Sequence, residues 1–287
     1  MVVRQSILPV AGRFSLGRAN QPRIKAATRR IAIGLCHAAL GWLSRPYRPQ
    51  AGSCVVFAPH PDDETLGCGG LIARKRNDGL PVHVVFITDG SASHPGHPQL
   101  SPAEVSAIRH REALEALAIL GVESPAIHFI DEKDGALIHL SPERQSRLVT
   151  QLAALLTRIN PAEIFLPCCP DGSSEHDATF GFVSAALARS KVHPAIWQYP
   201  VWSWWNPLLL FVRIIFNRGC CVQPAEDYHP IKTLALGRYR SQIEPALPWI
   251  EPVLQPELVR VCNSGQEYFF RFAPPPSSGD PAGEPVI

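Results

Sequence analysis

The sequence has no Cys-x-x-Cys motif, although it contains eight cysteines. Four of them form the adjacent pairs Cys168 with Cys169 and Cys220 with Cys221, which cannot easily bridge internally. Another, Cys54, lies in a segment that we predict to be a buried strand. These positions argue against a disulfide framework and favour reduced, mostly buried thiols in a cytoplasmic protein.

A strong excess of either charge is also missing, because 27 Lys and Arg residues face 25 Asp and Glu residues. This balance gives no reason to expect a nucleic acid partner for the protein as a whole. The charge is uneven near the N-terminus, where every charged residue from Arg4 to Arg48 is basic. Such an arm is typical of a disordered tail or of a segment that contacts a polyanionic surface.

Neither of the two apolar runs predicts a membrane-spanning helix. The run IAIGLCHAALGWL at residues 31–43 is too short, and PVWSWWNPLLLFVRIIF at residues 200–216 is broken by Pro207 and Arg213. Because Trp favours the headgroup region, both runs are compatible with peripheral membrane association. A core helix and a wall of a substrate pocket are equally compatible interpretations.

Short apolar segments alternate with amphipathic helical segments between about residues 50 and 200. The apolar segments predict strands at residues 54–60, 82–90, 126–130, 163–167 and 195–202. This order implies parallel pairing and a mostly parallel, Rossmann-like α/β fold with three α/β/α layers. We divide the chain into a basic, amphipathic extension over residues 1–49, one domain over 50–273 and a disordered Pro-rich tail over 274–287.

Imidazoles and carboxylates follow the ends of the predicted strands, where ligands gather in folds of this kind. The first strand runs into HPDDE, so three acids in a row follow a segment that should be buried. A His/Asp/His set suits zinc or a similar divalent metal, and a neighbouring carboxylate suits a general base. Loop caps and turn acids are the alternative, and spacing alone leaves both open. The residues concerned are His60, Asp62, Asp63, Glu64, Asp89, His94, His97, Asp131, Asp134, Asp171, Glu175, His176 and Asp177.

The blocks FAPHPDDETLGCGG, RHREALEALAILGV and DGSSEHDAT resemble the LmbE-like/PIG-L family of zinc-dependent N-deacetylases over about residues 53–245. The resemblance implies that His60, Asp63 and His176 bind zinc and that Asp62 is the general base on a metal-bound water. It also implies removal of an acetyl group from an N-acetylated amino sugar of the GlcNAc type, linked to a lipid or to a small molecule. Fe²⁺ or Co²⁺ could replace Zn²⁺ at such a site.

The chain departs from the family's D-x-H-P-D-H block, because Ser173 stands where relatives have the first His and Glu175 where they have the Asp. In several relatives that His stabilises the oxyanion or protonates the leaving amine. Ser173 can donate a hydrogen bond but cannot be a cationic acid. The identity of the general acid therefore stays open, and we include Ser173 among the substrate-binding candidates.

Three further residues are candidates for binding the substrate. Arg109 either reaches the substrate or pairs with Glu112, which is one turn away on the same predicted helix. Asp134 either positions a sugar hydroxyl or only forms its Asp-Gly turn. His94, with His97, lies in a loop that we interpret as a mobile substrate rim. The aromatic segment from Trp197 to Trp205 is a candidate wall for stacking a sugar face.

Two other functions remain as alternatives. One is a relative that binds metal but is catalytically weak. The other is a Rossmann-like nucleotide-dependent transferase, in which Asp89 or Asp131 would hold a ribose. The spacing of Gly67, Gly69 and Gly70 fits no dinucleotide fingerprint and lies within a predicted helix, so we expect close helix packing there instead. The oligomeric state does not follow from the sequence.

Overall fold

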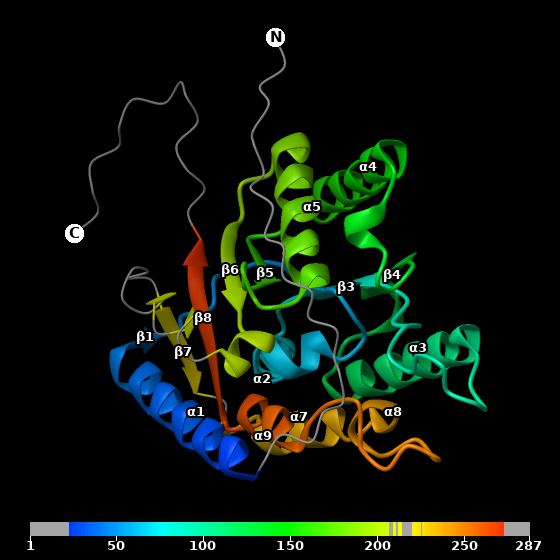
Figure 1. Ribbon diagram of the computed structural model, residues 1–287. Coiled ribbons are helices and arrows are strands. Elements are labelled where there is room, and N and C mark those ends of the chain that lie inside the picture. Colours follow the sequence, from blue (N-terminus) through cyan, green and yellow to red (C-terminus); the bar gives the residue numbers. More distant parts are fainter. Residues whose placement is uncertain (1–22, 207–208, 211, 214–219, 225, 273–287) are drawn as a thin grey trace.

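The computed structural model describes residues 23–206, 209–210, 212–213, 220–224 and 226–272 (Figure 1). Its centre is an eight-stranded sheet with the order β1-β7-β8-β6-β5-β2-β3-β4. The strands are β1 (Arg45–Pro46), β2 (Cys54–Ala58), β3 (Val82–Thr88), β4 (Ile127–Glu132), β5 (Glu163–Pro167), β6 (Ala195–Tyr199), β7 (Cys220–Pro224) and β8 (Gln266–Phe272). The α-helices are α1 (Arg23–Leu43), α2 (Asp63–Asn77), α3 (Pro102–Ile119), α4 (Pro142–Ile159), α5 (Ser174–Ser190), α7 (His229–Leu236), α8 (Arg240–Ile243) and α9 (Pro256–Cys262).

The predicted α/β fold is confirmed. Strands β6, β5, β2, β3 and β4 pair in parallel, as the alternation of strands and helices implies. Sequence analysis did not predict β1, β7 and β8. Strand β8 pairs antiparallel with both β6 and β7, so the sheet is mixed at this side. Six of the eight cysteines are buried, in agreement with the expectation of mostly buried thiols.

Both faces of the sheet are covered by helices, which makes the central strands apolar at every position. In β2, Val55 and Phe57 face the core under α4 and α5, whereas Cys54, Val56 and Ala58 face the core under α2 and α3. All five side chains are fully buried. Figure 1 shows α4 and α5 on one side of the sheet and α1, α2 and α7 on the other. Because the faces are covered, ligands can reach the sheet only at the edge formed by the loops that follow the parallel strands.

Glycines in α2 allow this helix to pack closely on its neighbours, as we expected from their spacing. A Cβ atom at Gly67 would lie 2.2 Å from a ring carbon of Tyr199, and one at Gly69 would lie 2.9 Å from Cγ of Lys232. Lys232 donates a hydrogen bond to the carbonyl of Leu66 and pairs with Glu267 at 2.7 Å. This buried pair holds α2, and with it the residues at its start, in one position.

The segment that we assigned to an N-terminal extension contributes to this sheet where it is described. Strand β1 pairs in parallel with β7, and α1 packs beside β7 and the 3-10 helix η3 (Trp202–Trp205). The side chains of Ile33 and Leu40 in α1 belong to the main core. Residues 1–22 and the predicted tail at 274–287 lie outside the described residues, so the three-part division of the chain stays a prediction.

The close approach at Gly67 predicts the effect of adding one methyl group. Gly67→Ala should destabilise the protein by about 1–3 kcal/mol, because the fully buried Tyr199 ring cannot move away without strain. Gly181→Ala is the matched control: Gly181 lies in α5 with no atom within 4 Å of its Cβ position. This control should be neutral or stabilising by up to about 1 kcal/mol. Urea denaturation measures both, and equal stabilities of the two variants would contradict the packing argument.

Candidate metal centre

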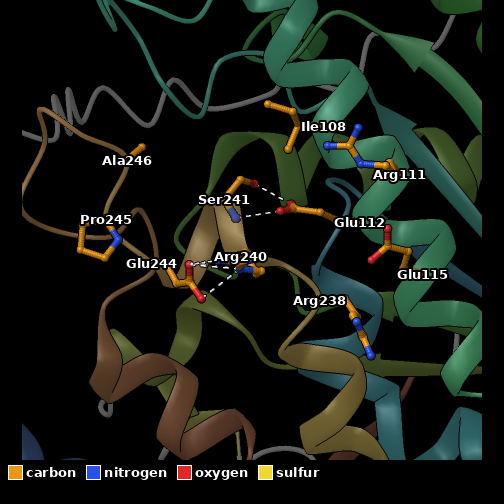
Figure 2. Close-up of a pocket in the computed structure, with 10 residues that line it drawn as sticks. All are labelled: Ile108, Arg111, Glu112, Glu115, Arg238, Arg240, Ser241, Glu244, Pro245 and Ala246. Atoms are coloured by element: carbon orange, nitrogen blue, oxygen red, sulfur yellow. Dashed lines mark hydrogen bonds and ion pairs between the residues drawn. The ribbon is translucent and has the colours of Figure 1, made fainter.

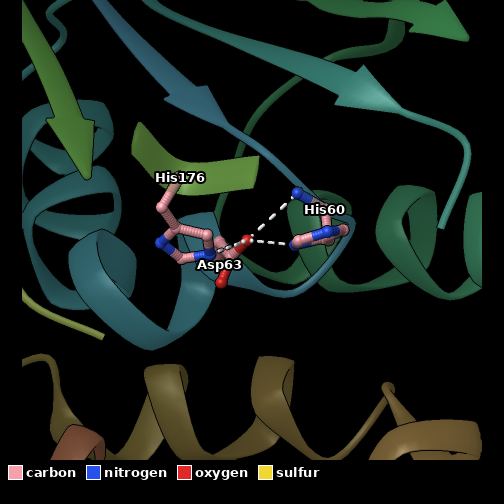
Figure 3. Close-up of side chains that lie close together, drawn as sticks. All are labelled: His60, Asp63 and His176. Carbon is pink, nitrogen blue, oxygen red and sulfur yellow. Dashed lines mark hydrogen bonds and ion pairs between the residues drawn. The ribbon is translucent and has the colours of Figure 1, made fainter. Parts of the chain in front are cut away.

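Two imidazoles and one carboxylate meet at the ends of two neighbouring strands (Figure 3). His60 follows β2, Asp63 is the first residue of α2, and His176 lies in the first turn of α5, which follows β5. Nδ1 of His60 lies 3.0 Å from Oδ2 of Asp63, and Nε2 of His176 lies 3.2 Å from the same oxygen. One ligand atom of each residue lies within 4.8 Å of those of the other two. The three residues that the resemblance implied as ligands thus lie close together, as we expected for residues near the carboxyl ends of parallel strands.

The donor set fits a zinc ion. Both His176 and Asp63 are almost completely buried, and neither ring nitrogen of His176 has a hydrogen bond of good geometry within the described part of the chain. Burial alone would raise the pKa of Asp63, but the two imidazoles hold it well below its usual range. A buried ring nitrogen without a hydrogen bond beside a fully ionised carboxylate is an arrangement that a cation would satisfy.

Each of the two histidines has a second carboxylate at its other ring nitrogen. Asp134 lies 3.2 Å from Nε2 of His60, and Asp171 lies 2.8 Å from Nδ1 of His176. Carboxylates in this position orient a ligating imidazole and raise its basicity. Sequence analysis placed Asp171 at a strand end without a role, and no local pattern distinguishes an acid that orients a ligand from one that caps a turn.

Asp171 also connects the site to the chain that follows β6. Its carboxylate accepts hydrogen bonds from the backbone amides of Trp202 and Ser203, and from the Ser203 hydroxyl. These bonds fix Asp171, and through it they fix the ring of His176. The start of η3 is therefore part of the support of the candidate centre.

Asp62 has a different partner from Asp63, although the two are adjacent. Its carboxylate lies 2.9 Å from Nη2 of Arg109, and Arg109 also donates hydrogen bonds to the carbonyls of Pro61 and Gly90. Burial raises the pKa of Asp62 to about 7, against the opposing effect of Arg109. The backbone of Asp62 has a φ of 143°, which is rare for a residue other than glycine. Backbone strain of this kind is concentrated at functional sites.

The alternative pairing of Arg109 with Glu112 is not the contact that forms. Glu112 instead accepts hydrogen bonds from the backbone amide and the hydroxyl of Ser241, in a cavity of about 350 Å³ between α3 and α8 (Figure 2). Arg240 pairs with Glu244 in the same cavity. None of the three candidate metal ligands lines this cavity. Arg109 is thus a support of Asp62, and its contact with a substrate stays a prediction.

Glu64, the third acid of the run, is fully buried and serves neither Asp62 nor Asp63 as a charge partner. It accepts hydrogen bonds from the hydroxyls of Thr65 and Tyr239, and from the backbone amide of Asp62. Burial raises its pKa to about 7. Glu64 thus lies in the first turn of α2 at its N-terminus, and the bond from Tyr239 links it to the C-terminal part of the chain.

A second group of ligand atoms adjoins the first. His60, Asp134 and Glu175 also lie within 4.8 Å of one another. Glu175 accepts a hydrogen bond from the amide of Leu137 at one carboxylate oxygen, while the other oxygen is buried without a hydrogen bond in the described residues. Sequence analysis placed Glu175 among the strand-end residues and noted it as a replacement in the family block, without a role as a ligand. Ser173 caps the same helix without a side-chain hydrogen bond, and its contact with a substrate stays a prediction.

The side chains of His94 and His97 are buried, and the interpretation of their loop as a mobile substrate rim stays a prediction. His94 stacks on Trp249, and Nε2 of His97 donates a hydrogen bond to the carbonyl of Leu247. Their loop lines a cavity of about 660 Å³. Binding of a substrate by His94 stays a prediction.

The expectation that the aromatic segment from Trp197 to Trp205 forms a wall for stacking a sugar is wrong for two of its tryptophans. Trp197 is buried in the sheet, where its indole N–H donates a hydrogen bond to Glu163. Trp204 is buried against His37 of α1. Parts of the apolar run at residues 200–216 lie outside the described residues.

With this geometry established, the chain can be compared with known proteins. Residues 55–187 match the profile of a family described as PIG-L, GlcNAc-PI de-N-acetylase. This range includes all three candidate ligands and their neighbouring carboxylates. Over this stretch the chain is similar to the PIG-L (LmbE-like) family.

The relatives are named as deacetylases. A 1D-myo-inositol 2-acetamido-2-deoxy-α-D-glucopyranoside deacetylase of Mycobacterium sp. (strain KMS) is 31% identical over 166 residues, which cover 50% of this chain and 51% of that protein. The chain thus spans about half the length of this relative. A probable N-acetyl-α-D-glucosaminyl L-malate deacetylase 2 of Bacillus subtilis (strain 168) is 25% identical, over 70% of this chain and 88% of that protein.

Solved structures share the fold. The N,N'-diacetylchitobiose deacetylase from Pyrococcus horikoshii superposes with a TM-score of 0.51 at 20% identity, covering 78% of this chain and 80% of that one. The 4-carboxy-2-hydroxymuconate hydratase GalB from Pseudomonas putida KT2440 superposes with a TM-score of 0.61 at 16% identity, covering 80% of this chain and 100% of that one. A deacetylase and a hydratase thus have this fold in common, and the reaction must be inferred from the site.

The contact between Asp171 and His176 predicts an effect on metal affinity. Asp171→Asn should weaken metal binding by about 10- to 100-fold, because His176 loses the carboxylate that orients its ring. Asp131→Asn is the matched control, since Asp131 forms a His–carboxylate pair with His110 outside the candidate centre. Competition with a chromogenic chelator measures both affinities. If Asp171→Asn bound zinc as tightly as the control, Asp171 would have no role in orienting a ligand.

Proposed function

We propose that the protein is a zinc-dependent deacetylase that removes the acetyl group from an N-acetylated amino sugar of the GlcNAc type in the cytoplasm. The observation that carries this proposal is the different surroundings of two adjacent carboxylates. Asp63 lies between two imidazoles, whereas Asp62 is held by Arg109 beside them. A metal ligand and a general base need this division of roles. The family match and the names of the relatives support the same reaction.

His60, Asp63 and His176 would hold the zinc ion. When bound, the metal would polarise the acetamide carbonyl and lower the pKa of a water molecule to near neutrality. Asp62 takes a proton from the attacking water, and the water oxygen bonds to the carbonyl carbon. The bond between this carbon and nitrogen then breaks as Asp62 returns the proton to the departing nitrogen. A free amine and acetic acid leave, and the acid releases its remaining proton to solvent to give acetate. Arg109 keeps the Asp62 carboxylate in place throughout.

The proton donor to the amine is the step where this chain differs from the family block. Ser173 can donate a hydrogen bond to the substrate but cannot supply a proton as a cationic acid. Asp62 is therefore our choice for both transfers, since its raised pKa allows it to carry a proton near neutral pH. If Asp62 cannot do so, the protein would bind metal and turn over slowly, which is the weak-relative alternative.

The substrate proposal is limited to the reacting group. The mycobacterial relative is named for an inositol-linked acetamido sugar, and the Bacillus relative for a malate-linked one. An acetamido sugar with a further group at its anomeric position is common to both. We therefore propose an acetamido sugar as the substrate of this chain and do not assign the group attached to it.

The proposal predicts different effects for the two aspartates. Asp62→Asn should keep one zinc per chain but lower kcat by about 10²- to 10⁴-fold, because the amide cannot accept a proton. Asp63→Ala should lose both the metal and the activity, because one ligand is missing. Metal content is measured by atomic emission, and activity by amine release from a panel of N-acetylglucosaminides. Asn has the same branching as Asp and nearly the same size, so the first variant should remain folded.

Two results would contradict the proposal. Full activity of Asp62→Asn would remove Asp62 from the reaction. Absence of metal from the wild-type protein after zinc is supplied, with the cysteines kept reduced, would remove the centre itself. Metal in the wild type without amine release from any compound of the panel would instead favour the catalytically weak relative.

A further inference from the structure

Helix α1 carries large apolar side chains on two opposite faces. Ile33 and Leu40 are buried in the main core. Ile31, Leu35 and Trp42 are 64%, 67% and 93% exposed. A helix whose only role was to cover the sheet would have apolar side chains on the face with Ile33 and Leu40. Its opposite face would carry polar side chains.

The exposed apolar side chains form one stripe. Because successive residues in an α-helix are about 100° apart, Ile31, Leu35 and Trp42 project within about 40° of one another. Ala38 falls in the same sector and is exposed as well. Ile33 and Leu40 project from the far side of the helix. A contiguous apolar stripe of this kind indicates a surface that contacts another apolar phase.

The charged residues that adjoin the stripe in the sequence are of one sign. The chain contains no Asp or Glu before Asp62. Arg30, on the first half of α1, is exposed, and Arg45 and Arg48, just beyond its C-terminal end, are also exposed. An apolar face with Trp, flanked by arginines, complements the anionic headgroups and the interfacial region of a lipid bilayer.

We propose that α1 is a membrane-docking helix that lies in the plane of an anionic lipid surface and inserts the stripe of Ile31, Leu35, Ala38 and Trp42 between the headgroups. In the part of the chain that the structure describes, no helix is long and apolar enough to cross a bilayer. Peripheral binding is therefore the mode that fits α1. This inference goes beyond the proposed reaction and does not depend on it.

The position of α1 relates this surface to the candidate centre. His37 of α1 packs against Trp204 of η3, with 5.9 Å between the ring centroids. The backbone of η3 donates hydrogen bonds to Asp171, which contacts His176. Helix α1 is thus joined through η3 to the sheet edge that carries the centre.

Flotation of the full-length protein with vesicles tests the proposal. Vesicles of phosphatidylcholine with phosphatidylglycerol should bind the wild type, whereas vesicles of phosphatidylcholine alone should bind it more weakly. Raising the salt concentration should reduce the binding, because it screens the arginines. The double variant Leu35→Gln with Trp42→Gln should lower the vesicle partition coefficient by at least about tenfold, since two apolar side chains are lost from the interface.

A matched double variant controls for the general loss of apolar surface. Leu234→Gln with Ile250→Gln removes two side chains that are 62% and 84% exposed but lie outside α1. This control should bind anionic vesicles like the wild type. Both double variants should melt at the wild-type temperature, because their side chains are outside the core.

Each remaining outcome would overturn the proposal. A wild type that does not bind anionic vesicles, a Leu35/Trp42 variant that binds as well as the wild type, or equal losses in both double variants would exclude docking through α1. Light scattering after gel filtration measures the oligomeric state and so tests the alternative that the stripe contacts a second copy of the chain. A wild-type dimer that the Leu35/Trp42 variant abolishes, without vesicle binding, would assign the stripe to a second copy of the chain.

Discussion

The structure depends on the burial of three consecutive carboxylates at the end of a central strand. Like charges so close together cannot be buried unless each has its own compensation. Asp62 is compensated by Arg109, Asp63 by two imidazoles, and Glu64 by hydroxyl groups that include that of Tyr239. Because these partners come from different directions, the three carboxylates point to different places, and only Asp63 is available as a metal ligand.

This constraint brings distant parts of the chain to one edge of the sheet. Arg109 comes from α3, and Tyr239 comes from the segment before α8, which lies within the range of the resemblance. Loss of one partner would leave a buried charge uncompensated, at a cost of about 3–5 kcal/mol. Close packing of α2 at Gly67, and the buried Lys232, keep the helix that begins with Asp63 from moving away. The contacts that stabilise the buried carboxylates thus also hold them in the orientation that the site needs.

The parts of the fold that sequence analysis predicted are those with a local signal. Apolar runs of strand length between amphipathic helices indicate the five parallel strands, and the strand-end rule brings His60 and His176 together. The antiparallel strands β7 and β8 have no such signal, since each is stabilised mainly by pairing with a segment far away in the chain. The support of His176 by Asp171 was missed for a similar reason, because the amides that hold Asp171 belong to η3.

The wrong expectation for Trp197 follows from the same geometry. We expected an aromatic residue such as Trp197 to stack on a sugar, but Trp197 is the central residue of β6, and helices cover both faces of that sheet. Its ring is therefore available to the core and to Glu163, not to a ligand. Trp202, which follows the end of β6 and is only half-buried, escapes this restriction. In a parallel sheet covered on both sides, a residue can take part in the site only if it lies beyond the carboxyl end of its strand, which holds for His60, Asp134 and Asp171 alike.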